Sequence, residues 1–195
     1  ARRNDDVGIT HVHHFYTKRT LIIFSEFLNR CNCNLSLLWV LTSVTEGSSK
    51  LNRERPFGLP SKLSGTLYIS SMIREINVLD FMYRKIKKRN SNSGLKFNKE
   101  FIIIYNASTS RTTIKENSID YIFTDPPFGK NIMYSELNYL WEAWLKVFTN
   151  NKYEAIVNNT QGKGLPEYQR LMEACFREYY RVLKPGRWMT VEFSN

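Results

Sequence analysis

The stretch DYIFTDPPFG at residues 120–129 places two consecutive prolines directly after an apolar run. Proline has no backbone N–H and holds φ at about −65°, so the pair ends any strand that runs into it. We therefore predict a strand over residues 120–124 that stops at Asp125. The prolines make the following turn rigid.

The segments around this turn alternate between strand-like and helix-like patterns. The sequence predicts strands over residues 101–105 and 187–193, and helices over residues 135–148 and 167–183. The run Lys184-Pro185-Gly186 is expected to close the second of these helices. Strand, strand, helix, helix, strand with apolar strands is typical of an α/β fold, a mostly parallel sheet flanked by helices. Ligands bind such sheets at the carboxyl ends of the strands, where Asp125 falls.

The first half of the chain has a different pattern. We expect helices over residues 18–29, with Thr17 as N-cap, and over residues 35–44 and 73–88, with a loop between the last two. The chain is thus interpreted as one partial domain, in which a mostly helical, loop-rich segment over residues 1–98 precedes a sheet segment over residues 99–195 that carries the turn.

The helix expected over residues 73–88 ends in the basic run RKIKKR at residues 84–89. Basic residues in the last turn of a helix complement the helix dipole. We favour this interpretation over a contact with DNA.

The whole chain carries 28 Lys and Arg against 18 Asp and Glu, a formal charge of +10. Such an excess favours a polyanionic partner, and nucleic acid leads because no apolar run is long enough to cross a bilayer. We predict DNA as a partner and no membrane. The three cysteines, Cys31, Cys33 and Cys175, fit reduced thiols in a cytoplasmic protein.

Two other groups of residues are interpreted as structural and not as functional. Histidines at positions 11, 13 and 14 lack further ligands at metal spacing, so we predict no metal site. Trp141 and Trp144 fall on the apolar stripe of their expected helix, which favours core packing over base stacking.

The turn itself has the groups needed to activate an aromatic amine. The amino group of a nucleobase is a poor nucleophile because its lone pair is delocalised into the ring. A carboxylate from Asp125 and the carbonyl of Pro126 can accept its two hydrogens, and Phe128 can stack on the base. The base has to leave the duplex to reach them. A bare Asp-Pro-Pro is more often only a rigid turn, but the preceding strand, the following helix and the basic charge favour catalysis.

The turn resembles motif IV of the DNA amino methyltransferases, which methylate adenine N6 or cytosine N4. Three segments carry the resemblance: HHFYTKRTL, IDYIFTDPPFGKNIMYSELNYLWEAWL and EYYRVLKPGRWMTVEFSN. It implies a Rossmann-like sheet of which this chain holds part, S-adenosylmethionine as cofactor, and DNA as substrate, with adenine N6 favoured. A restriction-modification partner is a possible companion. The sequence gives no oligomeric state.

The resemblance assigns roles to particular residues. The catalytic group is Asp125, Pro126, Pro127 and Phe128, while Asn106 and Asp125 would contact the cofactor. Four residues are candidates for nucleic-acid binding, two directly after the motif and two in the basic loop: Lys130, Asn131, Arg53 and Arg55.

One expected element is missing from the sequence. No strand is followed by a glycine-rich turn, since Gly162-Lys163-Gly164 lies between two helices. We therefore expect a chain cut before Ala1, inactive alone and without micromolar affinity for S-adenosylmethionine. Two alternatives remain open: a non-catalytic nucleic-acid-binding module, or a methyltransferase that acts on cytosine N4 or RNA.

Overall fold

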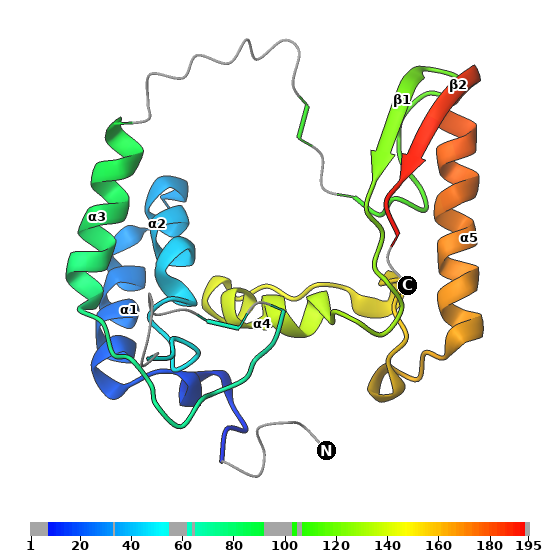
Figure 1. Cartoon of the computed structure of the whole chain (residues 1–195). Coiled ribbons are helices and arrows are strands. Elements are labelled where there is room, and N and C mark those ends of the chain that lie inside the picture. The colour runs from blue at the N-terminus through cyan, green and yellow to red at the C-terminus, as the bar shows by residue number, and fades with distance from the viewer. Residues whose placement is uncertain are drawn as a thin grey trace. The chain divides into compact units, whose positions relative to one another are not determined.

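The computed structural model describes residues 8–32, 34–54, 62–63, 65–91, 103–104 and 107–193 (Figure 1). The chain divides into two compact units. Unit 1 comprises residues 1–97 and 136–149, and unit 2 comprises residues 98–135 and 150–195. Helix α4 (Tyr134–Leu145) therefore begins in unit 2 and continues in unit 1.

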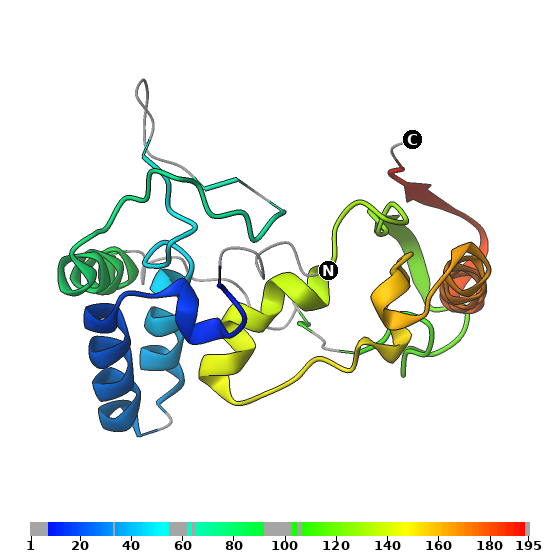
Figure 2. The ribbon, with the colours of Figure 1, turned by 90° about the horizontal axis from the view of Figure 1, so that it is seen from below.

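Unit 1 is built on the helices α1 (Lys18–Cys31), α2 (Leu35–Thr45) and α3 (Val78–Ser91), which pack against one another (Figures 1 and 2). The first two helices start where their caps predict. Thr17 Oγ1 accepts a hydrogen bond from Thr20 N at 3.3 Å, and Asn34 Oδ1 accepts one from Ser36 N at 2.9 Å. The helices predicted over residues 18–29 and 35–44 are thus confirmed.

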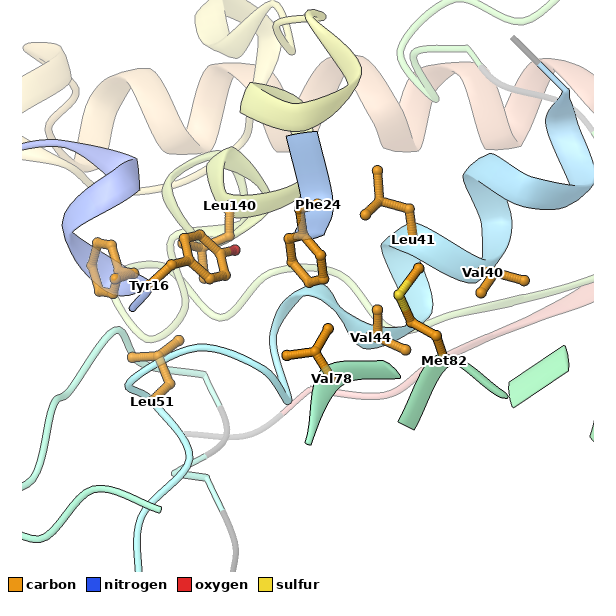
Figure 3. Close-up of a cluster of buried hydrophobic side chains, with 10 residues drawn as sticks. Tyr16, Phe24, Val40, Leu41, Val44, Leu51, Val78, Met82 and Leu140 are labelled. Atoms are coloured by element: carbon orange, nitrogen blue, oxygen red, sulfur yellow. The ribbon is translucent and has the colours of Figure 1, made fainter. Parts of the chain in front are cut away.

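The core of unit 1 is apolar and draws on all of its helices (Figure 3). Phe24, Leu41 and Val44 are fully buried, and Leu140 of α4 is buried with them. The two α4 tryptophans pack against this cluster. Trp141 Nε1 donates to Thr42 O at 2.9 Å, and the Trp144 ring lies edge-on to Phe24 at 5.2 Å. Their predicted role in core packing is confirmed.

Unit 2 contains a parallel pair of strands, β1 (Ile119–Thr124) and β2 (Leu183–Val191), beside α5 (Leu165–Val182) (Figure 1). Two short 3-10 turns, Asn151–Tyr153 and Asn159–Gln161, lie between α4 and α5. The strand predicted over residues 120–124 is confirmed, and the structure is mixed α/β with a parallel pairing. Within the described residues this sheet has two strands, so a full Rossmann-like sheet is not shown.

The face of the strand pair that carries Ile122 and Met189 is half-buried, whereas the opposite face is exposed. That exposed face carries Tyr121 opposite Trp188, with Phe123 alongside. We expected a sheet covered by helices, and the side that carries these aromatic rings is exposed instead.

Several predicted boundaries differ from the structure. The helix predicted from residue 73 begins at Val78, because Ile73 forms an antiparallel bridge with Arg53 and Asn77 Oδ1 accepts from Asp80 N at 3.2 Å. Helix α4 ends at Leu145 rather than at 148, since Lys146 adopts a left-handed φ of 55°.

The Lys184-Pro185-Gly186 run does not follow the helix as a closing turn but lies in β2. From the pair Ile119–Leu183 to the pair Tyr121–Trp188, β1 advances two residues and β2 advances five. The run therefore forms a bulge, in which Gly186 has a φ of 72°.

Most of the strand predicted over residues 101–105 lies outside the described residues. Its two described members, Ile103 and Ile104, are exposed and belong to no strand. None of the described helices combines the length and hydropathy needed to span a bilayer. Cys31 and Cys175 are free thiols, and Cys33 lies outside the described residues.

Candidate functional site

The Asp-Pro-Pro-Phe turn begins where the β1–β2 ladder ends. The last backbone hydrogen bond runs from Glu192 N to Thr124 O at 2.9 Å. Asp125 follows at once and is exposed, whereas Pro126 is buried. No residue that the structure describes forms an ion pair or hydrogen bond with the Asp125 carboxylate. The acid is thus held at a strand end with its oxygens available.

The two proline carbonyls have different surroundings. Pro127 O accepts hydrogen bonds from Tyr168 Oη at 2.7 Å and from Gly129 N at 3.0 Å. Tyr168 lies in the first turn of α5 and is only 8% exposed. No donor to Pro126 O is found among the described residues. Pro127 O is therefore saturated, whereas Pro126 O is left as an acceptor.

Phe128 is braced from the strand side. Its ring lies nearly perpendicular to that of Phe193, with centroids 5.3 Å apart. Asn131 N donates to Phe128 O at 3.3 Å, which closes a tight turn around Gly129. Gly129 has a φ of 60°, a conformation that side chains other than glycine rarely adopt. The ring of Phe128 is thus fixed against the end of β2.

Residues 150–164 form a loop that holds the segment after the motif. Val157 N donates to Gly129 O at 3.0 Å, and Asn158 Nδ2 contacts Met133 Sδ at 3.4 Å. Glu154 accepts from Ser135 N at 2.9 Å and from Ser135 Oγ at 2.6 Å. A carboxylate in this position caps the first turn of α4 and complements its dipole.

A nearly buried lysine stabilises the same loop. Lys163 is 8% exposed, and its Nζ donates to Asn151 O at 2.5 Å and to Glu154 O at 2.7 Å. Burial lowers the pKa of Lys163, and the charge of Glu154 opposes that shift. Because both carbonyls belong to the loop, the lysine holds its two ends together.

The structure places the predicted site residues as follows. The four catalytic candidates form one turn, and Lys130 and Asn131 follow it, both exposed. Arg53 belongs to unit 1, where it is half-buried and bridges to Ile73. Asn106 and Arg55 lie outside the described residues.

The described residues include little of the site predicted for S-adenosylmethionine. Of the two positions assigned to the cofactor, only Asp125 is described. Gly162 has a φ of 66° but follows the turn Asn159–Gln161 and not a strand. Two shallow hollows, one along α1 and one where Trp39 of α2 meets Arg89 of α3, both belong to unit 1. The cofactor assignment stays a prediction.

The histidine cluster is compact. The rings of His11, His13 and His14 lie 4.2 to 5.5 Å apart. Burial and the neighbouring imidazoles lower the pKa of His13. Within the described part of the chain, no group of three or more His, Cys, Asp or Glu is arranged to hold a metal ion.

Sequence reasoning did not find the residues that support the turn. Tyr168, Glu154 and Val157 come from segments that follow the motif by 25 residues or more, and no local pattern marks them. A weak signal could have indicated Phe193. It ends a predicted strand, and the carboxyl ends of neighbouring parallel strands lie side by side, so Phe193 could be expected near the turn. Comparisons of the chain with protein-family models, with curated proteins and with solved structures found no match.

Proposed function

We propose that unit 2 carries the amine-binding site of a DNA amino methyltransferase that acts on adenine N6. One observation supports this most directly: an exposed Asp125 carboxylate, to which no described residue is paired, stands next to the Pro126 carbonyl, to which no described residue donates. Tyr168 holds the adjacent Pro127 carbonyl, so the two acceptors keep one arrangement.

The proposed chemistry follows from these acceptors. Asp125 and Pro126 O each accept one hydrogen of the exocyclic amine, which frees the nitrogen lone pair from the ring. The nitrogen gains a methyl group and loses one proton, for which the Asp125 carboxylate is the acceptor. Phe128 stacks on the base, which has been flipped out of the duplex. S-adenosylmethionine is the proposed methyl donor on the resemblance alone.

The test compares two acidic residues of the same region. In the natural protein that carries this chain, Asp125→Ala should lower methyl incorporation into duplex DNA by about 100-fold or more, the size of a lost transition-state contact. Asp120→Asn is the matched control, because this exposed carboxylate pairs only with Lys184 and Arg187 among the described residues. Methyl incorporation at the wild-type rate by Asp125→Ala would show that the catalytic assignment of Asp125 is wrong.

The same assay separates the alternatives. Mass spectrometry of the digested DNA distinguishes N6-methyladenine from N4-methylcytosine. A parallel reaction with RNA as substrate tests whether the protein is an RNA methyltransferase. A protein that binds DNA but incorporates no methyl group into DNA or RNA, with Asp125 intact and S-adenosylmethionine supplied, is instead a binding module.

A further inference from the structure

Positive charge is concentrated in the unit that lacks the Asp-Pro-Pro-Phe turn. Unit 1 contains 17 Lys and Arg against 9 Asp and Glu, a net charge of +8. Unit 2 contains 11 against 9, a net charge of +2. The polyanion partner suggested by the whole chain is therefore to be sought on unit 1.

Helix α3 holds the densest group of these charges. Its 14 residues include five basic side chains and one acid, Asp80. Arg84, Lys87 and Lys88 are exposed and follow the spacing i, i+3, i+4, which places them on one side of the helix. The other side carries Val78 and Met82, which are buried in the core (Figure 3). We call Arg84, Lys87 and Lys88 the basic face.

The helix dipole accounts for only one residue of this face, Lys88. The last turn of α3 includes Lys88 and Arg89 only, because the helix continues to Ser91. Arg84, Lys85 and Lys87 lie further from the end, where the dipole has little effect. The explanation favoured from the sequence therefore covers two of the five basic residues.

Contacts with aromatic rings and with the backbone hold the neighbouring cations in place. Lys85 Nζ lies 5.3 Å from the centre of the Phe81 ring, and its charge helps burial to lower the pKa of Lys62. Arg89 packs over Trp39 at 5.3 Å and donates to Ser36 O at 3.0 Å. Within the basic face, Arg84 pairs with Asp80 at 3.0 Å.

We propose that the basic face of α3 binds the phosphate backbone of duplex DNA. Arg84 and Lys88 are separated by about 6 Å along the helix axis. A DNA strand presents one phosphate per about 3.4 Å of axis, so the three cations can meet two or three phosphates. This inference goes beyond the proposed methyl transfer and holds whether or not the protein is an enzyme.

Nucleic acid fits this face better than an anionic membrane. Helices that lie on a bilayer insert a broad apolar face into the lipid. The apolar side of α3 instead contributes Val78 and Met82 to the protein core. Leu79 and Tyr83 are exposed on the same helix, but its five cations outnumber these two apolar side chains, which suits a phosphate backbone.

The experiment measures the salt dependence of binding to a mixed-sequence DNA duplex of about 25 base pairs, between about 50 and 200 mM salt. The triple variant R84Q/K87Q/K88Q, in the natural protein that carries this chain, should reduce the slope of log K against log salt by about 2 to 3. The matched control K115Q/K152Q/R170Q removes three exposed cations from unit 2 and should change the slope much less.

Several results would overturn the inference. These are an unchanged slope in the α3 variant, an equal reduction of the slope in the unit 2 control, or tighter binding to phosphatidylserine vesicles than to DNA. Circular dichroism checks that each variant folds. If the triple variant does not fold, the single variant K87Q should still reduce the slope by about 1. An unchanged slope in K87Q would also overturn the inference. Methyl incorporation is measured in a separate assay from this slope, so failure of the methyltransferase proposal and failure of the DNA-binding face are recognised independently.

Discussion

The hydroxyl of Tyr168 is the one side-chain group among the described residues that binds a proline carbonyl of the turn. It donates to Pro127 O at 2.7 Å from the first turn of α5. Proline rings fix φ but leave ψ free, so the direction of each carbonyl still needs an external partner. We therefore regard Tyr168 as a positioning residue that acts through the turn.

Tyr168→Phe removes this hydrogen bond and keeps the ring. We expect a loss of about 1 kcal/mol in the free energy of unfolding, the usual net value of one hydrogen bond. If the proposed function is correct, kcat for methyl transfer should fall about tenfold with little change in KM for DNA, because the acceptors are misaligned and not removed.

Tyr180→Phe is the control for this prediction. Tyr180 lies on the same helix but is 85% exposed, so its hydroxyl should contribute little to either quantity. Steady-state kinetics and urea unfolding measure both effects. Equal kcat values for the two variants would show that Tyr168 does not position the catalytic turn.

At the scale of elements, α5 also holds the segment that leads into β1. Glu178 Oε1 accepts from Thr112 N at 2.8 Å and from Thr112 Oγ1 at 2.6 Å. Arg181 donates to the same carboxylate at 2.7 Å and to Ile114 O at 2.8 Å. One buried acid thus joins the helix to the chain just before the strand.

This network predicts an acid-dependent loss of stability. The hydrogen bonds from Arg181 and then Thr112 lower the pKa of Glu178 from 4.5 to about 2. A lowered pKa stabilises the fold while the carboxyl is ionised, so this contribution is complete above pH 4.5. It is lost as the pH falls toward about 2. Urea unfolding at several pH values follows the change.

Glu178→Gln should flatten the pH dependence over that range and cost about 2 kcal/mol at neutral pH. Glu173→Gln is the control, because Glu173 is exposed and pairs only with Arg177 among the described residues. If both variants keep the wild-type dependence, the acid sensitivity has another origin.

Local signals explain which elements could be predicted from the sequence. Thr17 and Asn34 cap their own helices, and the two prolines end β1. These boundaries are therefore determined by residues close to them in the sequence. The start of α3 depends instead on a bridge between Ile73 and Arg53, which no local pattern reveals. The end of α4 depends on one residue with a left-handed φ, Lys146.

The candidate site divides in the same way. Asp125 to Phe128 are consecutive, so their grouping follows from the sequence. Tyr168 follows Pro127 by 41 residues, and only the packing of α5 brings its hydroxyl to that carbonyl. The grouping of these four residues was therefore predictable, whereas the contacts that hold the turn were not.

For the whole molecule, charge and candidate chemistry are divided between the two units. The Asp-Pro-Pro-Phe turn belongs to unit 2, with a net charge of +2, and the basic face belongs to unit 1, with +8. The two proposals can therefore be tested by substitutions in different units that share no residue.

The exposed aromatic face of β1 and β2 supplies a natural fluorescent reporter. Trp188 is 79% exposed and is the single tryptophan of unit 2, while Trp39, Trp141 and Trp144 belong to unit 1. Its emission should lie at long wavelength and be quenched readily by acrylamide. Trp188→Phe should remove a large part of that quenchable signal and leave the part from Trp39, which is 49% exposed, and a spectrum left unchanged would contradict the exposure of this face. The same chain then carries separate optical signals for its two units, without any added label.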